Sequence, residues 1–100
     1  MKLIEAVINR LKLEEVRCAL DDIGVEDLME SDVITHSHRQ EQVMIFRGAR
    51  FVANLVEKVK LEIIAADDSA AMIVEAIGAI ARGERKEDCR ITMRQYLEAI

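Results

Sequence analysis

Two histidines lie one residue apart in the run His36–Ser37–His38. In an extended strand, residues i and i+2 project to the same face, so both imidazoles can reach one metal ion. Two ligands are too few for a stable site unless several copies of the chain each supply a pair. The alternative is that both histidines are ordinary polar residues at the root of a loop. We favour this alternative and keep a metal site at His36 and His38 as the competing hypothesis.

Three arginines, Arg39, Arg47 and Arg50, lie close together in an acidic chain. The whole sequence has 14 Lys and Arg against 19 Asp and Glu, a formal net charge of −5. A basic segment on an acidic body suits an acidic surface of a partner protein or the carbonyl-lined mouth of a pore. A solvated loop tip has the same composition, so the charge pattern alone leaves both interpretations open.

No combination of nucleophile, base and orienting group is evident. Ser31, Ser37 and Ser69 have no GxSxG context, and the two histidines are too close together to suggest a triad. Cys18 and Cys89 form no CxxC pair and cannot supply four zinc ligands. We expect structural thiols, with Cys89 as the candidate if one is reactive, because it lies in a charged stretch. The sequence therefore does not predict an enzyme.

Composition excludes further classes of protein. The net charge of −5 and the presence of only three aromatic residues, Phe46, Phe51 and Tyr96, oppose nucleic-acid binding. No stretch reaches the roughly 18 apolar residues of a membrane span. The N-terminal run has an acid, Glu5, among its apolar residues and no cleavage-site pattern, so we expect no signal peptide and a cytoplasmic location. A length of 100 residues predicts a single domain over residues 1–100.

Hydrophobic periodicity predicts the elements that position these residues. Alternation predicts strands over residues 1–8, 28–35 and 58–65 and a last strand from Ile91, and the 3.6-residue period predicts helices over residues 12–23 and from Asp67 or Asp68 to about Arg82. Gly24 fits a left-handed C-cap of the first helix. Asp67 or Asp68 fits the N-cap of the second helix, and Gly83 its end.

The same patterns predict the core. The expected core residues are Ile4, Ala6 and Ile8, Leu13, Val16, Leu20 and Ile23, Val59, Leu61, Ile63 and Ala65, and Met72, Ile73, Ala76, Ile77 and Ile80. Between residues 36 and 57 the pattern is irregular, with a short apolar run over residues 43–46. A segment this long in a small domain is usually functional or disordered, so we expect a flexible loop there.

The order of elements predicts a fold of the α+β class. Strand, helix, strand, long loop, strand, helix and strand make a ferredoxin-like βαββαβ sandwich. It has a four-stranded antiparallel sheet with two helices on one face, and the long loop joins its second and third strands. The residues Ile4, Val7 and Ile64 suggest that the bare face carries apolar groups, which would favour oligomerisation, but the pattern does not assign each of the three to a face.

Several segments, in the right order and with similar spacing, resemble the PII nitrogen-regulatory signalling family. The resemblance rests on residues 1–8, 12–17, 47–49 and 58–63, on Gly24, and on Asp67 and Asp68. The match is strongest in the run Arg47–Gly48–Ala49 and in the strand that follows Lys58. No single element is unique to the family, but together they span nearly the whole chain.

The resemblance implies a homotrimer with its three sheets facing inward and a cleft between neighbouring subunits. In the family this cleft binds ATP or ADP, sometimes with an organic acid. The ligand sets the conformation of the long loop, which docks on a transporter or an enzyme. The matched effector-binding positions are Lys58, Glu62, Asp88 and Arg90, and the matched partner-binding loop contains Arg39, Arg47, Gly48, Arg50 and Phe51.

The phosphate-binding loop departs from the family pattern T-G-x-x-G-D-G-K. The glycines of that pattern let backbone N–H groups approach phosphate oxygens. Here Asp88 matches and Arg90 replaces lysine, but Glu84, Glu87 and Cys89 stand where glycines are expected. Each carboxylate beside a triphosphate would be unfavourable by about 1 kcal/mol or more.

Other family positions differ as well. Asp27 replaces a glycine near the adenine side, and from the end of the chain at Ile100 we expect the family's second group of basic residues to be absent. Arg39–Gln40 matches the organic-acid motif without its glycines, so we do not predict 2-oxoglutarate binding. Phe51 stands where many relatives carry a modified tyrosine, and its lack of a hydroxyl excludes that modification there.

The leading hypothesis is a PII-like trimeric regulator in the cytoplasm. It senses a small effector between subunits and acts on a membrane transporter or a metabolic enzyme through residues 36–57, without binding nucleic acid. ATP, ADP and AMP are the candidate effectors, and another small anion or no nucleotide is the alternative. The competing hypothesis is a metal-binding or structural ferredoxin-like trimer of the cation-tolerance type that binds no nucleotide.

Overall fold

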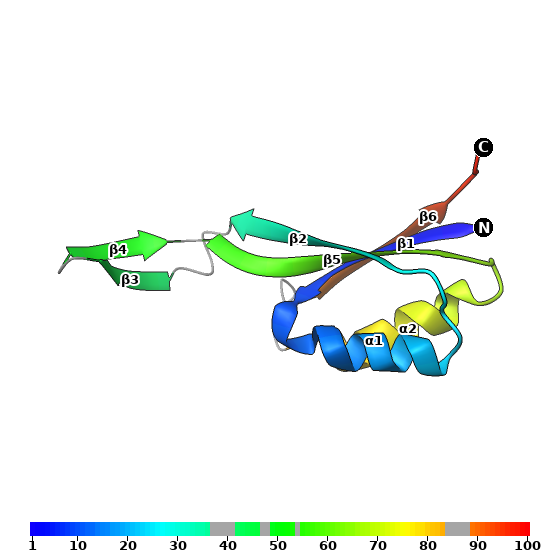
Figure 1. Cartoon of the computed structure of the whole chain (residues 1–100), viewed down its shortest axis with the longest axis horizontal. Helices are drawn as coiled ribbons and strands as arrows, with labels where there is room; N and C mark the ends of the chain where they lie inside the picture. Colours follow the sequence, from blue (N-terminus) through cyan, green and yellow to red (C-terminus); the bar gives the residue numbers. More distant parts are fainter. Residues whose placement is uncertain (37–41, 47–48, 54, 84–88) are drawn as a thin grey trace.

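The computed structural model describes residues 1–36, 42–46, 49–53, 55–83 and 89–100, with the backbone alone for residues 42–46 and 49–53. In chain order these contain β1 (Lys2–Asn9), a short 3-10 helix η1 (Arg10–Lys12), α1 (Leu13–Asp22), β2 (Met29–His36), β3 (Gln42–Phe46), β4 (Ala49–Ala53), β5 (Leu55–Ala65), α2 (Ala70–Ala81) and β6 (Cys89–Gln95). Four strands pair antiparallel in the order β2-β5-β1-β6, and both helices cover one face of that sheet (Figure 1). The predicted ferredoxin-like fold is confirmed.

The segment between β2 and β5 differs from the predicted loop. β3 and β4 pair antiparallel from Gln42 opposite Ala53 to Phe46 opposite Ala49, as a separate two-stranded sheet. Figure 1 shows this hairpin beyond the ends of β2 and β5. The apolar run that forms β3 contains β-branched and aromatic residues, which favour a strand. It lacks the apolar–polar alternation on which the sequence prediction depended.

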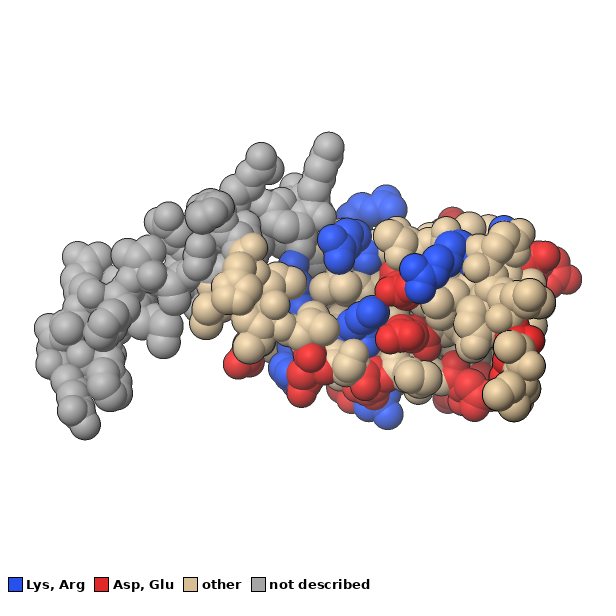
Figure 2. Space-filling model, turned by 90° about the horizontal axis from the view of Figure 1, so that it is seen from above, with Lys and Arg blue, Asp and Glu red and all other residues tan. Residues whose placement is uncertain are grey.

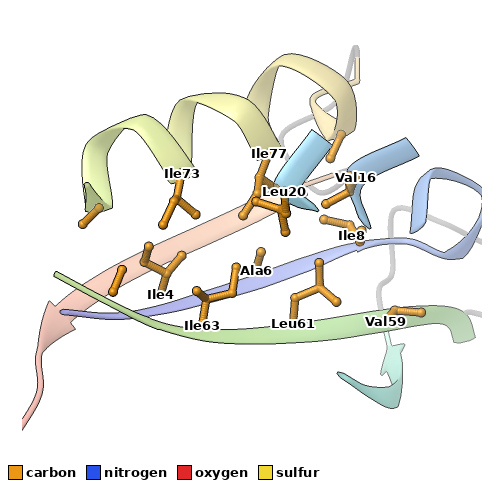
Figure 3. Packing of buried hydrophobic residues seen from close by; sticks show 13 residues of the cluster. Ile4, Ala6, Ile8, Val16, Leu20, Val59, Leu61, Ile63, Ile73 and Ile77 are labelled. Atoms are coloured by element: carbon orange, nitrogen blue, oxygen red, sulfur yellow. The ribbon is translucent and has the colours of Figure 1, made fainter. Parts of the chain in front are cut away.

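The core fills the space between the sheet and the two helices (Figure 3). Its buried members are Ile4, Ala6 and Ile8 of β1, Val16 and Leu20 of α1, Val59, Leu61, Ile63 and Ala65 of β5, and Ala70, Ile73, Ile77 and Ala81 of α2. The predicted alternation in β1 and β5 is therefore confirmed. Of the three residues named for the bare face, Ile4 does not lie there, because it is 0% exposed beneath the helices. Val7 and Ile64 alternate with core residues and do lie on the bare face.

The start of α2 differs from the prediction. The carbonyl of Ala66 accepts hydrogen bonds from the N–H groups of Ser69 and Ala70, each at 3.1 Å, and Ser69 rather than Asp67 or Asp68 is the N-cap. The helix ends at Ala81 with an extended Arg82 as its C-cap, so the predicted end at about Arg82 is confirmed. Gly83 follows directly after this C-cap.

The face that α2 presents to the core also differs in part. Met72 is 50% exposed and lies outside the core in which it was expected, whereas Ile80 packs against the core as a partly buried residue. Within the described part of the chain, no helix is both long enough and apolar enough to cross a membrane.

Gly24 closes α1 in the left-handed conformation that the sequence predicted, with φ at 89°. An added Cβ would meet nothing within 4 Å, so an L-residue there is unfavourable only through its backbone conformation. Gly24→Ala is expected to lower the free energy of unfolding by about 1 kcal/mol in urea denaturation. Gly78→Ala is the control, because this glycine lies inside α2 and the tightest contact of an added Cβ would be with Arg82 Nη2 at 3.3 Å, the far end of a flexible exposed side chain that can move away. Alanine should raise stability there by up to about 1 kcal/mol. Equal effects of the two changes would contradict the assignment.

Candidate functional site

The sheet face turned away from the helices carries charged side chains in neighbouring rows. Figure 2 shows this face from above, with acidic and basic groups side by side over the sheet. Glu5 of β1 lies opposite Glu62 on β5 and Thr92 on β6, and Val7 lies opposite Lys60 and Arg90. Successive rows of an antiparallel sheet bring such side chains into contact range.

Three of the four predicted effector-binding residues share this face. Lys58 lies opposite Asn9 and Val33, Glu62 lies two positions beyond Lys60 on the same strand, and Arg90 lies on β6. Lys58 is 5% exposed, which makes it a buried charged residue beside a cluster of half-exposed ones. The structure therefore gathers Lys58, Glu62 and Arg90 on one surface. Asp88 lies outside the described residues.

An ion-pair network holds the centre of this face. Glu5 accepts from Lys60 Nζ at 3.2 Å and from Arg94 Nη2 at 2.8 Å, and Lys60 Nζ lies 3.6 Å from Glu62 Oε1. The Glu5 side chain is 19% exposed, so its carboxylate has lost most of its water and depends on these cations. The bare face is thus ionic at its centre, where the sequence had suggested apolar groups.

Removing the Glu5 charge should therefore destabilise the fold. Glu5→Gln leaves Arg94 without this partner and is expected to lower the free energy of unfolding by about 1–2 kcal/mol. Glu14→Gln removes a carboxylate that is 81% exposed and paired with Arg17 at 3.2 Å, so it should change stability by less than about 0.5 kcal/mol. Urea denaturation of both variants at one protein concentration makes the comparison. A Glu5→Gln protein as stable as the control would show that the network adds nothing.

A hollow of about 390 Å³ opens on the same face. Its lining comprises Glu5, Val7, Val33, Thr35, Lys60, Arg90 and Thr92. No carboxylate of the described residues forms an ion pair with Arg90, whereas Lys60 is shared by Glu5 and Glu62. The hollow therefore offers a guanidinium that has no ion pair among the described residues, and two threonine hydroxyls next to two valines. This arrangement suits an anionic group attached to an apolar body.

A second hollow, of about 270 Å³, lies at the other end of β5. Asp27, Gly24, Ile64, Ser69 and Met72 are among its lining residues. It shares no lining residue with the hollow that contains Arg90. These two concave surfaces are separate within one copy of the chain, one lined by Lys60 and Arg90 and the other by Glu26 and Asp27.

The structure says less about the remaining predicted site residues. Arg39, Arg47, Gly48 and His38 lie outside the described residues. Arg50 and Phe51 lie on β4, opposite Ile45 and Met44, and the description there is limited to the backbone. His36 is exposed at the end of β2, and the described residues hold no group of three His, Cys, Asp or Glu placed to bind a metal ion.

Both cysteines are free thiols. Cys18 is exposed on α1, contrary to the expected structural role, whereas Cys89 is partly buried against the core.

Four residues of the site were not predicted as such: Glu5, Lys60, Thr92 and Arg94. Alternation had already put Lys60 on the polar face of its strand. Glu5 and Arg94 could not be placed beside Lys60 from the pattern of one strand. Their positions on this face depend on the register of β1 with β5 and with β6.

Known proteins resemble the chain over almost its whole length. The family model "Nitrogen regulatory protein P-II" matches residues 1–92. The chain is similar to the nitrogen regulatory protein P-II of Cereibacter sphaeroides, with 36% identity over 100 residues, which is all of this chain and 89% of the relative. The protein of the same name from Rhizobium meliloti (strain 1021) is 33% identical over the same shares of both chains. That of Pasteurella multocida (strain Pm70) is 32% identical over 91 residues, or 91% of this chain and 81% of the relative.

The matched segment contains the whole basic hollow, from Glu5 on β1 to Thr92 on β6. The shared name of these relatives is that of a nitrogen regulatory protein. From the extent of these matches and from the fold, we conclude that the chain belongs to the P-II family of nitrogen regulatory proteins.

Proposed function

We propose that this P-II family protein is a cytoplasmic homotrimer that senses a small anionic effector and is not an enzyme. The observation that carries the proposal is the convergence of Lys58, Glu62 and Arg90 on one bare sheet face, where Arg90 lines a hollow. These are three of the positions at which the chain matches the effector-binding residues of its family. Asp88, two residues before Arg90, is proposed as the fourth.

The charge of the face supports an anionic effector. Four cationic side chains, Lys58, Lys60, Arg90 and Arg94, meet two carboxylates, Glu5 and Glu62, on a chain whose net charge is −5. A local excess of positive charge on an acidic protein attracts anions to that surface. An adenine nucleotide, namely ATP, ADP or AMP, supplies both the anionic group and the apolar body that the hollow suits.

The separation of the two hollows within one chain supports binding between subunits. The basic hollow and the hollow with Asp27 are separate within one chain, so a single ligand touching both kinds of surface needs two copies. The bare sheet face is the surface that such copies would cover. Its central ion pairs are already satisfied within one chain, which makes covering it with other copies less costly.

The proposed output is the segment between β2 and β5. The effector would bind beside Lys58, a few residues along the same strand from the β3–β4 hairpin. Arg39, Arg47, Gly48, Arg50 and Phe51 lie in this segment and are the proposed contacts to a membrane transporter or a metabolic enzyme. A ligand with different affinities for two states of the hairpin would shift their populations and so change partner binding.

Calorimetric titration of ATP, ADP and AMP, with the oligomeric mass measured by light scattering in the same buffer, tests the proposal. Saturable binding near one nucleotide per subunit in a trimer is the expected result. A trimer that binds none of the three but binds zinc through His36 and His38 would favour the competing metal-binding function. A monomer that binds none of the three would exclude both.

A further inference from the structure

A groove of about 470 Å³ lies beside α1 and the chain that follows this helix. Figure 1 shows how that chain leads from α1 to β2. The groove is lined by residues between positions 14 and 30, all of them described, and it shares none with the hollow on the bare sheet face. It shares Val25 and Glu26 with the hollow that contains Asp27, and the proposed function gives no role to its other lining residues.

The floor of the groove is apolar and fixed. Leu20 is 1% exposed and belongs to the core, and Val25 and Leu28 pack against that core. The N–H of Val25 donates to the carbonyl of Leu20 at 3.0 Å, which holds the corner after α1 in place. A preformed floor of this kind favours binding, because no chain segment must be ordered when a ligand arrives.

The walls of the groove are acidic. Glu14, Cys18 and Asp21 follow one another at helical spacing along α1, Glu26 lies in the connection after that helix, and Glu30 lies on β2. Arg17 is the single cation of the lining, and its Nη1 lies 3.2 Å from Glu14 of α1 and 3.7 Å from Glu30 of β2. Within the described part of the chain, Asp21 and Glu26 have no ion pair, so these two carboxylates face the groove without a counter-charge.

We propose that this groove binds a basic, amphipathic segment of a partner protein. Arginine and lysine combine an aliphatic stem with a cationic head, so the stem can lie on Leu20, Val25 and Leu28 while the head reaches Asp21 or Glu26. A volume of about 470 Å³ exceeds that of a single side chain, which suits a peptide segment. Its charge and its place on α1 make it a second contact, independent of the arginines between β2 and β5.

The probe is a fluorescein-labelled ten-residue peptide of alternating leucine and arginine, titrated into the full-length protein and followed by fluorescence anisotropy. Asp21→Asn/Glu26→Gln is expected to weaken binding roughly tenfold, since two ion pairs are removed. Glu15→Gln/Asp22→Asn is the matched control, because it removes the same charge from exposed positions of the same helix that do not line the groove. The control should change affinity less than about twofold.

A second readout locates the peptide. Cys18 lines the groove with an exposed thiol, so bound peptide should slow its alkylation by iodoacetamide several-fold. Equal weakening in both double variants would mean attraction to the net negative charge of the protein and would overturn the proposal. Unchanged alkylation of Cys18 at saturating peptide would also overturn it. Spermidine that displaces the peptide at or below equimolar concentration would assign the groove to a small polyamine instead.

Discussion

Replacing Ile77 by alanine is expected to lower the free energy of unfolding by about 2–5 kcal/mol. Ile77 is 0% exposed and lies on the face of α2 that packs against the sheet (Figure 3). Truncation removes buried methyl groups and leaves a cavity that the neighbouring β-strands cannot close without moving. For a domain of this size, a loss near the upper end approaches the whole stability.

Met72→Ala is the matched control on the same helix. Met72 is 50% exposed, so its truncation should lower stability by less than about 1 kcal/mol. Both changes introduce alanine into a helix, so the difference in helix propensity is small. Urea denaturation at one protein concentration measures both, since association would make the midpoint depend on concentration. An Ile77→Ala protein no less stable than Met72→Ala would contradict the described packing of α2.

Replacing Arg90 by alanine is expected to weaken nucleotide binding roughly tenfold to a hundredfold. A guanidinium that binds a phosphate through charge-assisted hydrogen bonds contributes about 1.5–3 kcal/mol. Arg90 is exposed on β6 and forms no ion pair with the described residues, so its removal should leave the free energy of unfolding nearly unchanged. Arg90→Lys keeps the charge without the fork of donors and should fall between wild type and alanine.

Arg82→Ala is the control for Arg90→Ala. Arg82 is also an exposed arginine, but it lies at the end of α2 and does not line the basic hollow. Calorimetric titration of ADP into the three variants and the wild type separates the effects. Undiminished binding by Arg90→Ala would remove this residue from the effector site. Equal weakening by Arg82→Ala would attribute the effect to net charge.

Much of the fold could be predicted from local pattern. Val59, Leu61, Ile63 and Ala65 alternate with charged residues, and the structure buries all four. Gly24 has the positive φ expected of a glycine that closes a helix. Such features depend on a few neighbouring residues, which is why a single sequence contains them.

The wrong predictions concern features that depend on distant residues. Ile4 has the same chemical character on either face of β1, and only the position of the helices decides that it is buried. The start of α2 is set by the Ala66 carbonyl and the turn that it closes, although Asp67 and Asp68 have good capping chemistry. The β3–β4 hairpin is stabilised by pairing between two segments, neither of which alternates clearly.

The candidate site could be predicted only in part. Lys58, Glu62 and Arg90 were predicted as effector-binding residues from the resemblance to a family, and the structure puts all three on one face of the sheet. Glu5 and Arg94 lie far from Lys60 in the sequence, and the ion pairs of this group depend on the register of β1 with β5 and β6. A hydrophobic pattern that predicts each strand does not by itself predict which residues of different strands lie opposite one another.

Hydrogen exchange with and without saturating ADP tests whether an effector on the bare sheet face controls the segment between β2 and β5. Mass spectrometry of peptides covering residues 36–57 gives the response of that segment, and peptides from α2 serve as the internal reference. Slower exchange across residues 36–57 is expected when ADP is bound, with exchange in α2 unchanged. Saturated binding that leaves exchange across residues 36–57 unchanged would show that the effector has no influence on the proposed output.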